Sequence, residues 1–239
     1  MSPDVSVVVP VHDEADNVAA LAGEIATAFA GRPFEMLFVD DRSRDGTVAT
    51  LAALKPRHPE LRVLRHTGNA GQSRAVRSGV LAARAPVVVT LDGDGQNPPA
   101  DAPSLVARLA AGPETLALVG GRRVKRQDTA AKRWASKLAN GLRKRLLNDQ
   151  ADDTGCGLKA FRRDAYLRLP FFDHQHRYLP ALMLREGFEV AFVDVGHRPR
   201  GAGRSKYTNI GRLLDSLSDL LGVMWLNRRA RNPGVVREE

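Results

Sequence analysis

The stretch Thr90-Leu-Asp-Gly-Asp-Gly-Gln-Asn-Pro-Pro99 decides the fold of this chain. It continues an apolar run, Pro86–Leu91, that predicts a buried strand. The strand ends in two aspartates two residues apart, Asp92 and Asp94, each followed by a glycine. Side chains at i and i+2 of extended backbone point the same way, and the glycines leave room for a ligand near the backbone. Two such carboxylates suit Mg²⁺ or Mn²⁺ shared with a diphosphate; the alternative is a polar Asp/Gly turn that only closes the strand.

The composition indicates a globular chain with an anionic partner. With 239 residues, 43% of them hydrophobic, the chain can bury a full core as one domain, or as one domain with an appendage. Its formal net charge of +9 points to nucleic acid, an anionic membrane or a phosphorylated substrate.

Strands and helices are expected to alternate through the first half of the chain. Apolar, β-branched runs predict strands at Val5–Val9, Phe34–Val39, Leu61–His66, Pro86–Leu91 and Leu116–Gly120. Helices are expected from a cap at Asp13 to about Ala30, and over Thr47–Lys55, Gln72–Arg84 and Ala100–Ala111. This alternation predicts an α/β fold, with a mainly parallel sheet and helices on both faces.

Polar residues cluster after each of the first four expected strands. In parallel sheets, ligands bind outside the carboxyl ends of the strands. The clusters comprise Pro10 to Glu14, then Asp40 and Asp41, then Asn69, Gly71 and Arg74, and finally Asp92, Asp94 and Gln96. Either Asp40 or Asp41 is also expected to cap the turn at residues 43–46.

Cysteine usage and hydropathy bear on where the chain works. Cys156 is the single cysteine, so an internal disulfide is impossible; we expect a structural thiol in a reducing compartment. No signal peptide and no apolar stretch of 18 or more uncharged residues is visible. We therefore expect a cytoplasmic protein that does not span a membrane by itself.

A basic segment, Arg122 to Arg145, carries ten Lys and Arg residues against one acid, Asp128. Within it an apolar residue recurs at every fourth position: Trp134, Leu138, Leu142 and Leu146. This pattern predicts an amphipathic helix. It is either a solvated face over an ordinary core contact or a helix that lies on an anionic membrane.

The C-terminal part is expected to hold a strand at Phe188–Val195, a Gly/Arg loop at His197–Tyr207 and a helix at Ile210–Leu226. We place a first domain at residues 1–207 and an amphipathic helix with a tail at 208–239. The helix has an apolar face, ending in Arg228 and Arg229, made of Leu213, Leu214, Leu217, Leu220, Leu221, Met224 and Trp225. That face is expected either to attach to the inner face of a membrane or to pack on the first domain, on a second copy or on a small membrane protein.

Several motifs, in the same order, resemble those of the family-2 inverting glycosyltransferases of the GT-A fold. They are Val9-Pro-Val-His-Asp-Glu14 with Asn17, Val39-Asp-Asp41 with Asp45-Gly-Thr47, Asn69-Ala-Gly71 and Asp92-Gly-Asp94. Further motifs are similar to the dolichyl-phosphate mannose synthase group and its bacterial relatives that act on undecaprenyl phosphate. These are Gln96-Asn-Pro-Pro99, Asp153-Thr-Gly155 before Leu158-Lys-Ala-Phe-Arg162, His176-Arg-Tyr-Leu-Pro180, and Arg200-Gly-Ala-Gly203-Arg-Ser-Lys-Tyr207.

The resemblance implies inverting, Mg²⁺- or Mn²⁺-dependent transfer of a hexose from GDP-mannose or a UDP-sugar to a polyprenyl phosphate. The implied metal ligands are Asp92 and Asp94. The implied donor-binding residues are Pro10, His12, Glu14, Asp41, Asp92, Gln96, Arg200 and Lys206. In the arginine-rich second half, the candidates for binding the acceptor phosphate are Arg122, Lys132, Arg133 and Ser136. Arg200, Ser205 and Lys206 are expected to close over the donor diphosphate or the acceptor phosphate. Asp94, Arg122 and Arg200 are assigned catalytic roles.

The nature of the acceptor separates the alternatives. A sugar hydroxyl must lose a proton to a general base, whereas a lipid phosphate is already an anion and needs cations to bind it. The arginine-rich second half favours the phosphate, because the arginine fork matches phosphate oxygens. A saccharide hydroxyl remains the alternative acceptor. A nucleic-acid partner is disfavoured, because aromatics make up only 5% of the chain and do not interleave with the basic run.

The chain departs from the family pattern at two places. His12 and Asp13 stand where the family usually has an aromatic residue and an asparagine, and glycines and Asn97 flank the aspartates where relatives often have alanine, leucine and histidine. The metal ligands are kept, and the preference for nucleobase and sugar is left open.

Overall fold

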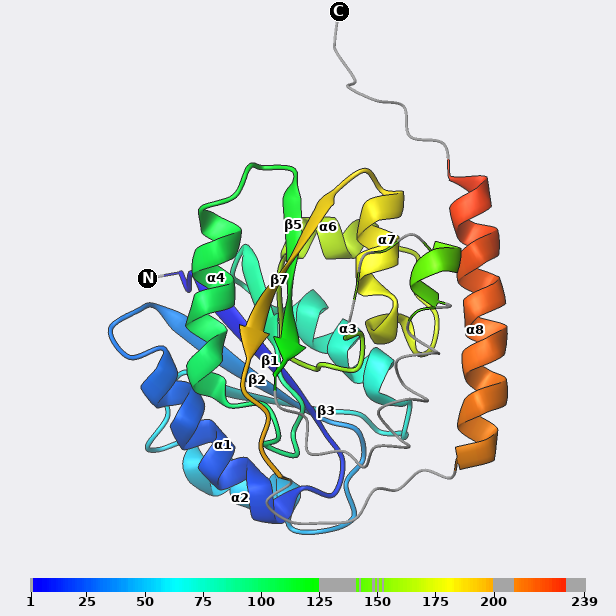
Figure 1. Ribbon diagram of the computed structural model, residues 1–239. Helices are drawn as coiled ribbons and strands as arrows, with labels where there is room; N and C mark the ends of the chain where they lie inside the picture. The colour runs from blue at the N-terminus through cyan, green and yellow to red at the C-terminus, as the bar shows by residue number, and fades with distance from the viewer. Residues whose placement is uncertain are drawn as a thin grey trace, which may run out of the picture.

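The computed structural model describes residues 2–124, 141, 143–147, 149, 151, 153–199 and 209–230, with side chains from residue 217 onward in the last stretch. The described residues form a seven-stranded sheet in the order β3-β2-β1-β4-β6-β5-β7 (Figure 1). Its strands are β1 (Val5–Val11), β2 (Phe34–Asp40), β3 (Leu61–Arg65), β4 (Val87–Thr90), β5 (Leu116–Arg123), β6 (Lys159–Arg162) and β7 (Glu189–Val195). The strands β1 to β4 are mutually parallel, and β7 is parallel to β5.

The sheet contains one strand, β6, that the sequence did not predict. β6 lies between β4 and β5 and is antiparallel to both. It is short and carries Lys159 and Arg162 at its ends, so it lacks the apolar run on which strand prediction depends. Because β6 reverses direction, β4 and β5 still end at the same edge of the sheet.

Helices cover both faces of the sheet, as predicted (Figure 1). Their bounds are α1 (Ala15–Ala28), α2 (Thr47–Leu54), α3 (Gln72–Ala82), η1 (Pro99–Asp101), α4 (Ala102–Ala110), α6 (Arg163–Arg168), η2 (Gln175–Arg177), α7 (Leu179–Arg185) and α8 (Asn209–Arg229). One apolar core joins the sheet to α1, α2 and α4, with Leu21, Leu51 and Leu105 in it. A second core, on the other face, joins it to α3, α6 and α7, with Val76 and Leu182 in it.

The start of α1 differs from the expectation of a cap at Asp13. Asp13 adopts a left-handed φ of 53°, and the N-cap residue is Glu14, whose side chain makes no capping hydrogen bond. Instead, Asp45 accepts from the Ala15 amide and Thr47 from the Glu14 amide, at 3.1 and 2.9 Å. The first turn of α1 is therefore satisfied by the segment that opens α2, a contact between distant residues that local capping rules do not reveal.

The prediction that one aspartate of the Asp40-Asp41 pair holds the following turn is confirmed for Asp40. Its carboxylate accepts from the Ser43 amide at 3.0 Å and lies 3.3 Å from Arg65. Asp41 has a different role, described with the site below.

The basic segment that begins at Arg122 lies mostly outside the described residues, including Trp134 and Leu138. Its described end, residues 141 and 143–147, is helical. Arg143 is buried there; it pairs with Asp149 and donates to the Ala151 carbonyl. Leu147 is buried, whereas Leu146 is 41% exposed. This end of the segment is thus attached to the core through an apolar side chain and a buried ion pair.

The helix α8 packs along α7 (Figure 1). Val223 is fully buried, and Leu220, Met224 and Leu226 pack against the second core. Asp219 accepts from His174 Nδ1 at 2.8 Å, and Arg185 donates to the Leu226 carbonyl. The expected single apolar face is therefore divided, since Leu217, Leu221 and Trp225 point away and are 55%, 58% and 59% exposed. Within the described residues, no helix combines the length and the hydropathy needed to cross a bilayer.

Candidate active site

The two aspartates of the Asp92-Gly-Asp94 motif follow β4 at the carboxyl end of the parallel strands. Asp94 is buried, and its Oδ1 accepts from the Gln96 amide at 3.1 Å, which closes a tight turn. Gly95 in this turn has a left-handed φ of 69°, which favours glycine. The two carboxylates interact: the negative charge of Asp94 raises the pKa of Asp92.

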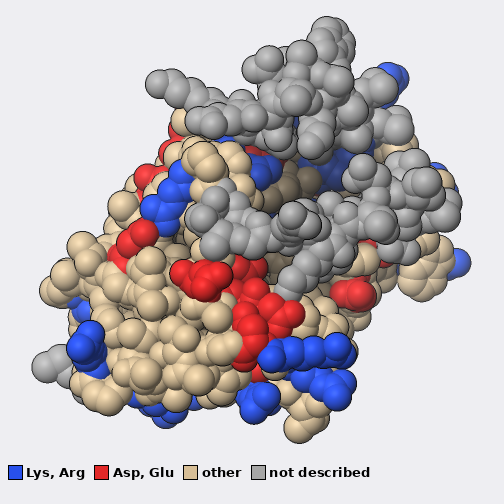
Figure 2. Space-filling view, turned by 90° about the horizontal axis from the view of Figure 1, so that it is seen from below, with Lys and Arg blue, Asp and Glu red and all other residues tan. Residues whose placement is uncertain are grey.

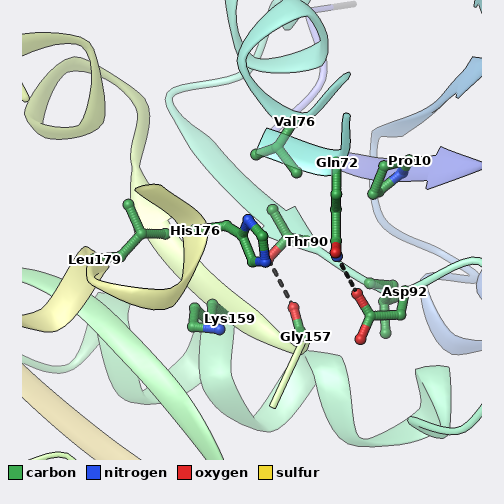
Figure 3. A pocket seen from close by; sticks show the side chains of 10 residues that line it. Pro10, Gln72, Val76, Thr90, Asp92, Gly157, Lys159, His176 and Leu179 are labelled. Carbon is green, nitrogen blue, oxygen red and sulfur yellow. Dashed lines mark hydrogen bonds between the residues drawn. The ribbon is translucent and has the colours of Figure 1, made fainter. Parts of the chain in front are cut away.

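Asp92 lines a small pocket between the end of the sheet and the helices α3 and α7 (Figure 3). Gln72, the first residue of α3, donates its amide to Asp92 Oδ1 at 2.8 Å. Burial, and next the charge of Asp94, raise the pKa of Asp92 to about 6, against the opposing effects of Lys159, Arg123 and Gln72. The ionised form of Asp92 is thus disfavoured, and a cation would relieve it.

Gly157 lets the Asp92 side chain lie close against the backbone of the segment before β6. The Thr90 hydroxyl donates to the Gly157 carbonyl at 2.9 Å, which fixes the segment before β6 against the end of β4. A Cβ atom at Gly157 would lie 2.2 Å from Asp92 Oδ2. A side chain at this position would therefore displace the carboxylate.

The turn after Asp94 is held from two sides. Asn97 donates to Cys156 Sγ at 3.5 Å, and both side chains are buried, as expected for a structural thiol. On the other side, the Arg198 amide donates to the Gln96 carbonyl, and its guanidinium reaches both the Gly95 carbonyl and Glu24 on α1. The segment that leads from β7 toward residue 200 is therefore attached to the backbone of the Asp92–Asn97 turn.

Asp41 connects the ends of β1, β2 and β3. Its two carboxylate oxygens accept from the Ala70 and Gly71 amides at 2.9 and 2.7 Å, and from His66 Nδ1. Its carbonyl accepts from His12 Nδ1 and from the Asn69 amide. Asp41 therefore fixes the loop that precedes α3, and with it the position of Gln72 beside Asp92.

The structure brings together several of the residues that the sequence predicted for the donor site. Pro10 lines the same pocket as Asp92, and His12 lies beside Asp41. Glu14 accepts from the Asn17 amide at 2.6 Å. Gln96 lies in the turn after Asp94. These residues therefore lie in a strip along the carboxyl ends of β2, β1 and β4.

Arg122 and Arg123 at the end of β5 point to different partners, as neighbouring strand residues do. Arg122 is the one that the sequence predicted as a site residue. Its Nε lies 2.6 Å from Oδ1 of Asp194 on β7, and both side chains are about half exposed. Arg123 forms a two-pronged pair with Asp153, at 2.7 Å for each bond. Of these two arginines, Arg123 is the one whose charge acts on Asp92: after the larger effect of Lys159, it opposes the rise in the pKa of Asp92. Six other predicted residues lie outside the described residues: Lys132, Arg133, Ser136, Arg200, Ser205 and Lys206.

Gln72, Lys159 and His176 line the pocket beside Asp92 but were not among the predicted site residues. Lys159 is buried, which lowers its pKa, and it donates to the Cys156 carbonyl. In the sequence, Lys159 and His176 were marked only by their place in two motifs that resemble the family, Leu158-Lys-Ala-Phe-Arg162 and His176-Arg-Tyr-Leu-Pro180, and Gln72 was not marked at all. Neither motif revealed that these residues, far apart in sequence, meet beside Asp92.

Seen from the carboxyl ends of the strands, a cluster of acidic side chains lies near the centre of the described part of the face, with basic side chains around it (Figure 2). The acidic cluster by itself would repel an anion and attract a cation. Among the described residues, His, Cys, Asp and Glu side chains nowhere gather in threes that could hold a metal ion. A cation at Asp92 and Asp94 would thus take further ligands from a bound molecule or from water.

Comparison with known proteins agrees with this geometry. The family model described as glycosyl transferase family 2 matches residues 6–169. The undecaprenyl-phosphate 4-deoxy-4-formamido-L-arabinose transferase of Pseudomonas aeruginosa (strain LESB58) is 36% identical over 223 residues, which cover 92% of this chain and 65% of that protein. The dodecaprenyl-phosphate galacturonate synthase of Rhizobium johnstonii is 32% identical over 238 residues, which cover 98% of this chain and 70% of that protein.

Solved structures support the fold. Glucosyl-3-phosphoglycerate synthase from Mycobacterium tuberculosis, crystallised with Mn²⁺, uridine diphosphate and glucosyl-3-phosphoglycerate, has a TM-score of 0.71. The two sequences are 19% identical, and the match covers 98% of this chain and 82% of the other. The same enzyme was also crystallised with Mg²⁺ and uridine diphosphate. The chain has the GT-A fold, and it belongs to glycosyl transferase family 2, in which the relatives named above are sugar transferases of polyprenyl phosphates.

Proposed function

We propose that this protein transfers a sugar from a nucleotide-diphosphate sugar to a polyprenyl phosphate. The observation that carries the proposal is the pair Asp92 and Asp94 at the carboxyl edge of the sheet. It is supported by the relatives of this chain, which are named as transferases of undecaprenyl and dodecaprenyl phosphate. The chain spans 65% of the length of the arabinose transferases, so the activity of the whole relative is extended to this chain by inference.

The residues present fit a divalent metal ion such as Mg²⁺ or Mn²⁺. Burial and the neighbouring Asp94 raise the pKa of Asp92, and acidic side chains dominate the centre of this face. Both observations are expected where carboxylate oxygens that suit a divalent ion lie close together without a cation between them. Asp92 and Asp94 would hold the ion; when bound, it supplies positive charge to the diphosphate as that group leaves.

The protein's own residues position the donor on this strip. Pro10, His12 and Asp41 lie where the nucleoside is expected, and Asp41 keeps the loop before α3 in place. Gln72 then orients the Asp92 carboxylate through a hydrogen bond of 2.8 Å. Such fixed polar groups lower the reorganisation needed during the reaction.

The acceptor phosphate attacks the sugar directly. One of its oxygens forms a bond to C1 of the sugar while the bond from C1 to the diphosphate oxygen breaks, and the nucleoside diphosphate departs. Attack from the side opposite the leaving group inverts the anomeric centre. Because the phosphate is already an anion, no general base is required. Arg122 and the predicted cations in and after the basic segment are proposed to bind it.

We also propose that the protein works on the inner face of a membrane as a peripheral protein. Leu217, Leu221 and Trp225 on the outer side of α8 are exposed, and Arg228 and Arg229 end the same helix. A Trp- and Leu-bearing face ended by arginines suits an anionic lipid surface. This face would bring the site to a lipid-embedded acceptor.

A donor screen tests the function. The protein is incubated with Mg²⁺ or Mn²⁺, a short-chain polyprenyl phosphate and each of a panel of UDP- and GDP-sugars, and the lipid is analysed by mass spectrometry. We expect one glycosylated lipid phosphate, lost on chelation and in the Asp94→Asn variant. If no donor gives a product, the proposed transfer to a polyprenyl phosphate is refuted. Full activity in excess chelator would refute the proposed dependence on a divalent metal ion.

A further inference from the structure

The side chains of Ser73 and His176 are paired in a way that fixes the proton on the imidazole. Ser73 Oγ lies 2.6 Å from His176 Nδ1 and also accepts from the His176 amide at 3.3 Å. Ser73 is 1% exposed, so its hydroxyl proton needs an acceptor within the protein. Among the described residues, His176 Nδ1 is the acceptor that hydroxyl has, so the imidazole proton resides on Nε2.

The ring is neutral as well as fixed. Burial lowers the pKa of His176 well below its ordinary value, with smaller effects from Arg177 and Lys159. A neutral imidazole with its proton on Nε2 offers one hydrogen-bond donor and no acceptor on that side. It cannot take a proton there, so it is not the general base that a hydroxyl acceptor would need.

His176 lies in η2, just before α7, and its ring points into the pocket that Asp92 lines (Figure 3). The other polar groups of the pocket already have partners: the Thr90 hydroxyl donates to Gly157, and Gln72 donates to Asp92. In the described part of the chain, nothing accepts from His176 Nε2. The pocket therefore presents a free, oriented N–H a short way from the carboxylates.

We propose that His176 binds one oxygen substituent of the donor sugar through Nε2–H, and that Ser73 positions the ring for this. The inference rests on the proposed function, because a diphosphate held at Asp92 and Asp94 places the attached sugar beside this pocket. The pocket is small and has Val76 and Leu179 in its wall, so it suits one hydroxyl-bearing part of the ring. Once a bound sugar covers the pocket, an N–H left without its oxygen is costly, which makes such a contact a means of selecting among sugars.

Two substitutions separate the roles of the two ring nitrogens. In His176→Gln the side-chain amide extends to about the position of Nε2 and can keep the donor. In His176→Asn the amide reaches only about as far as Nδ1, so the bond to Ser73 can remain while the donor in the pocket is lost. Ser73→Ala removes the group that fixes the proton.

The test is calorimetric binding of UDP-glucose, UDP-galactose, UDP-glucuronic acid and GDP-mannose, each compared with UDP or GDP alone, in the presence of Mn²⁺. For at least one sugar we expect the wild type to bind the sugar nucleotide more tightly than the nucleoside diphosphate. His176→Asn should lose this difference, on the order of tenfold for one hydrogen bond, and His176→Gln should keep most of it. Binding of UDP or GDP alone and the unfolding temperature should be unchanged in both.

Several outcomes would overturn the inference. One is a wild type that gains nothing from any sugar; another is a His176→Asn variant that keeps the gain. Equal losses in Asn and Gln variants, or weaker binding of UDP and GDP themselves, would show a structural role instead. A failure of the proposed function is separate, because it would appear as absent transfer to polyprenyl phosphate while the binding differences persist.

Discussion

The carboxyl group of Asp92 is destabilised by its surroundings when it is ionised. Its pKa is raised from 3.8 to about 6, first by burial and then by Asp94. Because the folded-state pKa exceeds the unfolded value, ionised Asp92 opposes folding above about pH 6. That cost disappears as the pH falls toward 3.8, where the group is protonated in both states.

The Asp92→Asn variant is therefore expected to unfold at a higher temperature than the wild type at neutral pH without divalent metal. The difference should shrink as the pH falls through 6, the folded-state pKa. Thermal unfolding followed by circular dichroism over a pH series measures it. Asp164→Asn, at an exposed position of α6, is the matched control and should show no such pattern. A variant less stable than the wild type at neutral pH would contradict this account of Asp92.

Gly157 offers a second test at the scale of one residue. Gly157→Ala places a methyl group 2.2 Å from Asp92 Oδ2, so the carboxylate must move. We expect the variant to lose the increase in unfolding temperature that Mn²⁺ with UDP gives the wild type, together with most transfer activity. Gly23→Ala in α1, where nothing lies within 4 Å of the added atom, should keep both. A fully active Gly157→Ala protein would mean that the position of Asp92 is not critical.

Residues that carry chemistry in a local pattern were predictable, and residues joined by the fold were not. Asp92 and Asp94 follow an apolar run at fixed spacing, so their place at a strand end could be predicted. Gln72, Lys159 and His176 are far apart in sequence and meet only because α3, β6 and η2 converge on that strand end. Arg122 and Arg123 illustrate a finer difficulty: neighbouring strand residues point to opposite faces, and the sequence did not show that Arg123 pairs with Asp153 and acts on Asp92.

At the scale of elements, the alternating apolar runs predicted β1 to β5 and the helices between them. β6 was missed because its pairing with β4 and β5, and not its own composition, makes it a strand. The apolar residues of α8 were predicted correctly as a set, but their division between an inner and an outer side depends on where α7 lies. Periodicity gives the width of an apolar face and not what covers it.

The outer side of α8 provides the prediction at this scale. We expect the protein to co-sediment with liposomes that contain anionic lipid, and increasing salt to weaken the binding, because each arginine near such a surface contributes about 1 kcal/mol. The double variant Leu221→Ser, Trp225→Ser should bind less at every salt concentration. Leu81→Ser on α3 removes a leucine that is 55% exposed, as Leu217 is, and should leave binding unchanged. Binding that ignores both salt and anionic lipid would rule out electrostatic attachment.

At the scale of the whole molecule, charge and topology together favour the proposed reaction. The chain has a net charge of +9, yet a cluster of acidic side chains lies at the carboxyl edge of the sheet, where its motifs converge (Figure 2). A divalent cation bound between these carboxylates and a nucleotide diphosphate would offset the repulsion between the two negatively charged groups. The remaining positive charge is available for a second anion, the phosphate of the acceptor.

The most direct test of the account compares two acceptors that differ only in that phosphate. Once a donor is identified, the protein is given a short-chain polyprenyl phosphate and the corresponding free prenol, at equal concentration in the same detergent, and both products are quantified by mass spectrometry. Because the phosphate is already ionised and the site needs no general base for it, we predict that the phosphate is glycosylated and the prenol is not. Comparable transfer to the prenol, or preferential transfer to a sugar hydroxyl, would contradict the account.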